Sequence, residues 1–187
     1  MKMEQYAYVL DFLSQGRVTD RYREPIAHVM GTTYFTLLEI TVKKDTSLSI
    51  GQKIFVGKDG RNEVERIKRR IEYEDLTATG KSQLESVIKE IIIEKEQEFI
   101  NFFNKCGAIS IRQHQLELLP GIGKKHTEEI KKEREKKLFE SFKDIQERVS
   151  LIPDPIHILV IRILDEIKHT TKYYLFSKPP ITKESRF

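Results

Sequence analysis

Cysteine is nearly absent from this sequence. Cys106 is the only one among 187 residues, so an intrachain disulfide, a four-thiolate zinc site and a CxxC redox pair are all excluded. Proteins that do without disulfides are typical of reducing compartments. We therefore expect a cytoplasmic location.

The sequence also lacks a hydrophobic run long enough to cross a membrane. The longest apolar-rich stretch, IHILVIRILDEI at residues 156–167, is interrupted by Arg162 and is shorter than the ~20 residues that a spanning helix needs. The N-terminal stretch MKMEQYAYVLDFLSQGR has no small-residue cleavage site of the kind that ends a signal peptide. A soluble protein with no membrane partner is expected.

Motifs of catalysis and of cofactor binding are missing as well. The sequence contains no Walker loop, no GxGxxG after a strand and no GxSxG elbow. In some DNA glycosylases a catalytic aspartate follows a Gly/Pro-rich loop, but neither Asp144 nor Asp154 does so here. The five histidines form no HExxH or HxH pair and are scattered at His28, His114, His126, His157 and His169. We therefore expect no enzyme, no cofactor and no metal.

What the chain has in abundance is charge of both signs. Lysine and arginine number 33 against 29 aspartates and glutamates, which gives a net charge of +4 and a pI near 9.0. This mild basic excess makes a polyanion such as nucleic acid a plausible partner without requiring one. A chain of this length can bury one large core or two small ones, and two compact units are expected.

The first part of the chain carries the pattern of short β-strands. The segment TYFTLLEITVK alternates, so Leu38 and Ile40 are expected to face a core while Glu39 and Thr41 face water. The segments AYVLDFL and IGQKIFVG also have strand character, and a KDG turn follows the second of them. Four or five short strands with glycine turns predict a small closed β-barrel.

From Gly80 the hydrophobic period becomes that of a helix. The segment KSQLESVIKEIIIEKEQEFINFFNK places its apolar residues on one helical face, and Gly107 stands where the helix should end. A final strand is expected at Tyr173–Phe176. The predicted parts are a barrel, a long connecting helix, a domain of short helices, and a C-terminal strand with a mobile tail, at residues 1–79, 80–107, 108–170 and 171–187. The expected fold class is therefore α+β with more than one domain.

The most informative motif is LELLPGIGKKHTEEI. Gly121 and Gly123 allow a tight turn around Ile122, and we expect a side chain at position 123 to strain it. Amides at the start of the next helix have no intrahelical acceptor, and the helix dipole adds positive charge, so the turn can hold a phosphate oxygen. Basic residues flank and extend this turn: Lys124, Lys125, His126, Lys131, Lys132, Arg134, Lys136 and Lys137. Four glutamates of the same segment partly cancel their charge.

This motif resembles the helix-hairpin-helix, whose hairpin amides bind the sugar-phosphate backbone of nucleic acids. On that resemblance Gly121, Ile122 and Gly123 form the hairpin, Lys125 faces the phosphate, and Thr127 occupies the small-residue position where the two helices touch. An ordinary helical hairpin, in which the glycines merely end one helix and begin the next, is the alternative interpretation.

A second, degenerate copy of the motif is expected downstream. A shift of 33 residues lays LLPGIG on LIPDPI. Asp154 and Pro155 replace the first glycine and the apolar residue, and Ile156 replaces the second glycine. Because proline has no amide to donate, this copy is predicted to be structural.

The order of segments over nearly the whole chain resembles one archaeal family. The segments YAYVLDFL, SIGQKIFVG, ERIKRRIEYEDLT, LPGIGKK, FESFKDIQERV, IPDP and KYYLF are similar to those of the predicted RNA-binding proteins of domain of unknown function 655. The resemblance implies an OB-like β-barrel joined to a helix-hairpin-helix domain. It also implies that the genes of the family often lie among genes for translation, transcription and ribosomal RNA modification.

The barrel offers a second candidate surface. OB barrels bind single strands with basic groups for phosphates and aromatic rings for bases. Tyr34 or Phe35 is the expected stacking residue, and the expected cations are Arg66, Lys68 and Arg70 of one strand with Arg17, Arg21 and Arg23 of the loop before Ile26. The alternative is that outward basic residues only keep a sheet edge soluble.

Together these features favour a non-catalytic nucleic-acid-binding protein. RNA is favoured over DNA through the family resemblance alone, because hairpin amides contact phosphates that both polymers share. One alternative is a protein-interaction module that docks on ribosomal or transcription proteins. A second alternative is a DNA-binding or repair accessory protein.

Overall fold

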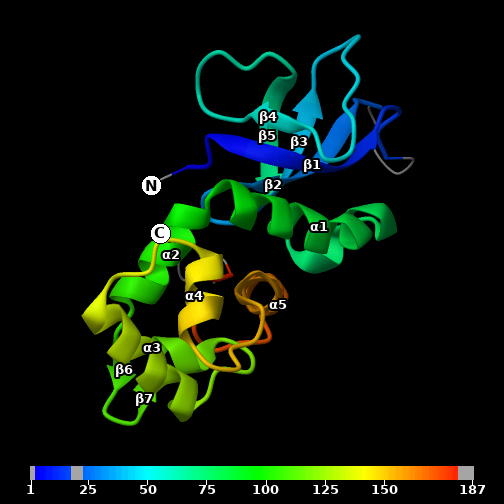
Figure 1. The fold of residues 1–187 in the computed structure, drawn as a ribbon. Helices are drawn as coiled ribbons and strands as arrows, with labels where there is room; N and C mark the ends of the chain where they lie inside the picture. The colour runs from blue at the N-terminus through cyan, green and yellow to red at the C-terminus, as the bar shows by residue number, and fades with distance from the viewer. Residues whose placement is uncertain (1–2, 18–22, 181–187) are drawn as a thin grey trace. The chain divides into compact units, whose positions relative to one another are not determined.

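The protein is described by a computed structural model over residues 3–17 and 23–180, and it is an α+β protein (Figure 1). Its residues group into two compact units, one of residues 1–87 and 165–187 and the other of residues 88–164. The segments expected from the sequence follow the change of hydrophobic period along the chain. The contacts instead join the C-terminal residues to the N-terminal unit, so that this unit is discontinuous in sequence.

The first unit is built on a curled antiparallel sheet of five strands. Its strands are β1 (Tyr6–Leu13), β2 (Ile26–Gly31), β3 (Leu37–Val42), β4 (Lys53–Phe55) and β5 (Val64–Arg70). Their order is β4-β1-β2-β3-β5, with β4 and β5 as the two edges. The closed barrel expected from the sequence is therefore wrong for the described strands, which form a half-barrel, because β4 pairs only with β1 and β5 only with β3.

One face of this sheet holds an apolar core, as the alternation in the sequence predicted. Its members come from all five strands and the loops beside them: Ala7, Val9, Ala27, Val29, Leu38, Ile40, Val42, Leu48, Ile54, Val56 and Val64. The opposite face was expected to be wet and is not. Glu39 is 1% exposed, Thr41 4% and His28 0%. Both faces of the central strands are thus covered, and this second face buries polar groups.

The edge strand β5 departs from simple alternation. Its pairing with β3 shifts register twice, between Glu39 and Ile40 and between Thr41 and Val42. Each shift leaves one extra residue in β5, which exchanges the faces of the side chains that follow. As a result Arg69, rather than Lys68, stands directly opposite Glu39.

The helix expected over residues 80–107 is two helices. They are α1 (Ala78–Glu94) and α2 (Glu96–Lys105), and they meet at Lys95, whose φ of −109° and ψ of 30° lie outside the helical region. Glu96 and Glu98 lie in the first turn of α2, where a helix dipole favours negative charge. At the other end, Gly80 of α1 donates its amide to the Thr77 hydroxyl, which caps the helix. Among the described helices, none is both long and apolar enough to span a membrane.

The second unit is mainly helical but also contains a small hairpin that the sequence did not predict. Its elements after α2 are β6 (Ala108–Ser110), β7 (Gln113–His114), the 3₁₀ helix η2 (Gln115–Leu118), α3 (Lys124–Lys136), α4 (Phe142–Arg148) and α5 (Pro155–Ile167). Among the described strands, β6 and β7 pair only with each other. The core of this unit gathers large side chains from each of its helices, among them Phe103, Leu116, Ile130, Ile145 and Ile163.

The C-terminal segment lies in the first unit and is held by a buried carboxylate. Glu166 is 0% exposed and accepts hydrogen bonds from the backbone N–H groups of Leu175, Phe176 and Ser177 at 2.7 to 3.0 Å. Residues 173–176 form no strand, so the strand predicted there is wrong. The reason is that these amides donate to a side chain and not to a neighbouring strand. The tail predicted to be mobile falls largely outside the described residues.

Candidate nucleic-acid interface

The turn before α3 places its apolar residues as the motif requires. Leu116, Leu119, Ile122 and Ile130 are each at most 5% exposed, and they anchor both sides of the turn in the core of the second unit. Ahead of the turn stands the four-residue 3₁₀ helix η2, where a longer α-helix would be usual.

The two glycines of the turn play different parts. Gly121 has a φ of +77°, and a Cβ there would lie 3.0 Å from the Cγ of Pro153, so this position needs glycine. Gly123 has a φ of −103° and no atom within 4 Å of an added Cβ. The expectation that a side chain at position 123 strains the turn is therefore wrong, because its backbone is extended and its surroundings are open.

The turn and the first turn of α3 present a row of free amides. Ile122 donates to the carbonyl of Leu119 at 3.1 Å, and Thr127 donates to that of Gly123 at 3.0 Å. Gly123 is the N-cap of α3 and supplies no side-chain acceptor. Within the part of the chain that the structure describes, no acceptor is found for the backbone N–H groups of Gly121, Gly123, Lys124, Lys125 and His126. These donors are the ones an anion needs at a helix start.

The lysines beside these amides are exposed and take no part in the ion pairs of α3. Neither Lys124 nor Lys125 forms an ion pair with any described residue, and both side chains lie in solvent. His126 is half-buried, and Thr127 is 2% exposed and packs inside the unit. The start of α3 therefore combines free donors with two unpaired positive charges.

The remaining basic residues of this region add less charge than the sequence suggested. Lys131 pairs with Glu128 at 3.0 Å, and Lys136 pairs with Glu133. Arg134 turns inward and donates to the backbone carbonyls of Phe103 and Cys106, both at 2.9 Å. Among the described residues, the unpaired cations of α3 are thus Lys124 and Lys125 at its start and the exposed Lys132 about two turns further on.

The second turn, at LIPDP, offers no such site. Pro155 is the first residue of α5 and has no amide, and the Asp154 carboxylate accepts the N–H of Ile156 at 3.0 Å. The carboxylate occupies the position that an anion would take and adds a negative charge. Pro153 of this turn contacts Gly121 of the first one, so the two turns lie together.

A groove adjoins the start of α3. It has a volume of about 470 Å³, and its walls are the β6–β7 hairpin and one face of α3. The residues that line it include Ser110, Ile111, Arg112, Gln113, His114, Glu117, Lys124, Thr127, Glu128 and Lys131. Lys124 belongs both to this groove and to the row of free amides. The groove could not be predicted from the sequence, since the short strands that form it have no apolar alternation.

In the first unit, three of the basic side chains converge on one buried carboxylate. Glu39 pairs with Arg17 at 2.5 Å, with Lys68 at 3.4 Å and with Arg69 at 3.6 Å. Burial lowers the pKa of the neighbouring His28, although its contact with Glu39 opposes that effect. Arg17 and Lys68 were expected at the site, whereas Arg69 was missed because the bulges in β5 cannot be read from the sequence.

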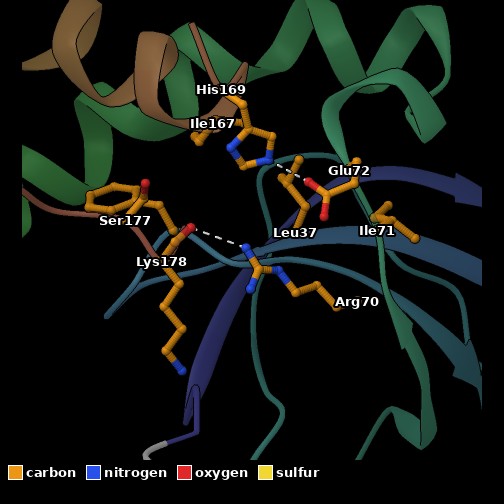
Figure 2. Close-up of a pocket in the computed structure, with 9 residues that line it drawn as sticks. Leu37, Arg70, Ile71, Glu72, Ile167, His169, Ser177 and Lys178 are labelled. Carbon is orange, nitrogen blue, oxygen red and sulfur yellow. Dashed lines mark hydrogen bonds and ion pairs between the residues drawn. The ribbon is translucent and has the colours of Figure 1, made fainter. Parts of the chain in front are cut away.

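The other predicted residues of this unit are spread apart. Arg66 pairs with Glu24 at 3.0 Å, and Arg23 is exposed. Arg70 donates to the carbonyls of Lys178 and Pro179 at 3.1 and 3.0 Å, and Figure 2 shows the first of these bonds. Arg21 lies outside the described residues. The predicted row of Arg66, Lys68 and Arg70 is thus not a single surface.

Of the two expected stacking residues, only one is accessible. Phe35 is 4% exposed and cannot present its ring to a base. Tyr34 is half-buried, and the ammonium of Lys178 lies 4.2 Å from the centre of its ring. A base that stacks on Tyr34 would have to displace this lysine.

The pocket between the sheet and the C-terminal segment is too small for a ligand. It is lined by Arg70, Glu72, His169 and Ser177 among others, and its volume is about 10 Å³ (Figure 2). That is about the space of one water molecule. The Nε2 atom of His169 instead forms a hydrogen bond with a carboxylate oxygen of Glu72 at 2.6 Å, and this bond joins the residues after α5 to those after β5.

Comparisons with known proteins identify a family and a matching fold. The family model described as "Protein of unknown function (DUF655)" matches residues 3–178. The uncharacterized protein MJ0038 of Methanocaldococcus jannaschii is 42% identical over 179 residues, which cover 95% of this chain and 81% of that protein. The crystal structure of Af1531 from Archaeoglobus fulgidus, which carries the same family name, superposes with a TM-score of 0.85 at 46% identity, and the match covers 94% of this chain and 100% of that one.

Proposed function

The chain belongs to the DUF655 family, and from the geometry of its 121–126 turn we propose that it is a non-catalytic nucleic-acid-binding protein. In this proposal the turn is a helix-hairpin-helix with a degenerate second copy at residues 152–156, and the half-barrel is OB-like. RNA is proposed ahead of DNA, as the resemblance of the sequence to predicted RNA-binding proteins implies.

The observation that carries the proposal is the row of free amides at the start of α3. Five backbone donors without an acceptor among the described residues stand beside Lys124 and Lys125. A phosphate diester offers two charged oxygens that satisfy such donors, and the helix dipole favours its negative charge. Because these groups touch only the backbone of the polymer, binding should be independent of sequence.

The cations around Glu39 support a second contact on the first unit. Arg17, Lys68 and Arg69 are held near one another by the carboxylate that they share. Each is about a third or more exposed, so each can also reach a phosphate. Glu39 and Asp75, which pairs with Arg69 at 3.3 Å, offset two of the three charges, so the patch keeps one net positive charge.

The competing proposal is a protein-interaction module, and exposed apolar side chains favour it. Ile111, Leu138 and Leu151 of the second unit are 106%, 59% and 90% exposed. Large apolar side chains in solvent are typical of docking surfaces when they form one patch, whereas single ones are common on any protein surface. An apolar dock responds little to salt, whereas phosphate binding weakens steeply with it.

The test is a titration of fluorescent single-stranded and duplex RNA and DNA at about 50 and 200 mM salt. We expect Kd values in the micromolar range that rise with salt, and Lys124→Glu with Lys125→Glu should weaken binding to every sequence by about tenfold or more. The melting temperature should stay within about 2 °C, because both side chains are exposed and unpaired.

The matched control reverses Lys136 and Lys137 at the other end of α3. This pair changes the net charge by the same amount and lies away from the free amides. It also breaks the ion pairs of Lys136 with Glu133 and of Lys137 with Glu140, which are surface pairs that contribute little to stability. If the two double variants weaken binding equally, the effect is general charge and the turn is not the site. If no polymer binds at low salt, the interaction module is the better interpretation.

A further inference from the structure

We propose that the groove between the β6–β7 hairpin and α3 binds one unpaired nucleotide, adjacent to the phosphate held at the start of α3. The proposal deepens the proposed function, on which it rests, because it predicts that the protein prefers single-stranded to duplex nucleic acid. It concerns the second unit alone.

The size and position of the groove suit a nucleoside. A volume of about 470 Å³ lies within the ~300–1,000 Å³ usual for small-molecule pockets. Lys124 lines the groove and also follows Gly123, whose amide is free. A strand whose phosphate sits on these amides therefore has its next nucleoside at the mouth of the groove.

His114 supplies a donor whose direction is fixed. Its Nδ1 accepts the backbone N–H of Leu116 at 3.1 Å, so in the neutral ring the proton is on Nε2. Burial, followed by the charges of Arg134 and Lys131, lowers the pKa of His114, which keeps the ring neutral at pH 7. Within the described chain Nε2 has no partner, and it is available to a carbonyl oxygen or ring nitrogen of a base.

A second polar group of the groove is also unsatisfied. Thr127 is 2% exposed, and its hydroxyl is buried with no hydrogen-bond partner among the described residues. A buried hydroxyl without a partner is costly, and a ligand that reaches it would remove that cost. Thr127 belongs to the lining of the groove.

The remaining walls complement an unpaired base in other ways. Glu117 and Glu128 can accept hydrogen bonds from the amino groups of a base, as carboxylates accept them from the N4 amino group of cytosine. Ile111 stands fully exposed at the tip of the β6–β7 turn and can cover the flat face of the base. In a duplex each base is stacked and its Watson–Crick edge is paired, so only an unpaired nucleotide can enter the groove and bring its whole edge to these groups.

The experiment compares a fluorescent single-stranded RNA hexamer with a duplex of the same sequence by anisotropy. Ile111→Ser and, separately, His114→Ala should weaken single-strand binding by about fivefold and leave duplex binding unchanged. Leu151→Ser is the control, since Leu151 is also an exposed apolar residue at a turn of this unit but does not line the groove. Ile111 lies in solvent, so its variant tests the groove even where His114→Ala reduces stability.

The possible results separate the two proposals. A loss of affinity that is confined to the single-stranded RNA supports nucleotide binding in the groove. Equal losses of affinity for the single strand and the duplex, or no loss with either variant, overturn the proposal that the groove binds a nucleotide. The amide site is then still tested by Lys124→Glu with Lys125→Glu. No binding of any polymer overturns both.

Discussion

Gly123 caps α3 without offering a side-chain acceptor, and this makes the phosphate proposal testable at a single residue. In Gly123→Ser the hydroxyl would accept the N–H of Lys125 or His126, as serine does at N-caps. The free energy of unfolding should rise by a few tenths of a kcal/mol. Nucleic-acid affinity should fall at the same time, because the hydroxyl competes with phosphate for the same donors.

Gly123→Ala is the matched control for this prediction. Alanine leaves the amides free and fits the open space at position 123, so affinity should be retained while stability falls by up to about 1 kcal/mol. Urea denaturation and anisotropy titrations measure the two quantities. A serine variant that binds as tightly as the alanine variant would show that these amides do not hold the ligand.

His28 gives the protein a defined dependence on pH. Burial lowers the pKa of its folded state from 6.5, so below that pH the unfolded chain binds more protons than the folded one. The part of the free energy of unfolding that His28 controls should therefore be constant above about pH 7, fall as pH decreases through 6.5, and level off below the folded pKa.

Denaturation curves at several pH values, with an NMR titration of the imidazole signals, test this prediction. His114 has a pKa shifted in the same direction, so His114→Ala removes its share and isolates that of His28. A His28 signal that titrates at or above 6.5 would contradict the expected slope.

At the scale of elements, local patterns in the sequence predicted strand β3 and the turn before α3. Strand β3 and the buried positions Leu116, Leu119, Ile122 and Ile130 of the turn follow directly from apolar spacing. These features depend on residues that are close in sequence, where period and burial are linked.

Features that depend on distant parts of the chain could not be predicted in this way. The bulges of β5 arise from its pairing with β3, and they bring Arg69 to Glu39 in place of a regular row. The burial of Glu39 is contrary to the usual expectation that a charged residue on a strand faces water. It is possible because cations from two separate segments compensate the carboxylate, a property no single segment reveals.

At the scale of the whole molecule, the first unit depends on residues from both ends of the chain. Glu166→Gln tests this dependence, because the carboxylate accepts three backbone N–H groups and the hydroxyl of Ser177. Hydrogen bonds to charged groups contribute about 1.5–3 kcal/mol each to stability, and the contributions of bonds that share one acceptor group are not additive. We therefore expect Glu166→Gln to lower the free energy of unfolding by about 2–3 kcal/mol.

Hydrogen exchange locates the effect. The amides of Leu175, Phe176 and Ser177 should exchange much faster in Glu166→Gln than in the native protein, while those of α3 should not change. Glu128→Gln is a control on an exposed glutamate of the second unit, and it should alter neither. Unchanged protection at residues 175–177 would show that the carboxylate does not hold the segment.

The discontinuous first unit also sets an order of events at the ribosome. Residues 88–164 are all synthesised before residue 165, so the inserted helical unit has its full complement of residues while the sheet still waits for Glu166 and its partners. The first unit is therefore the last to acquire all of its residues, although its strands are the first to leave the exit tunnel.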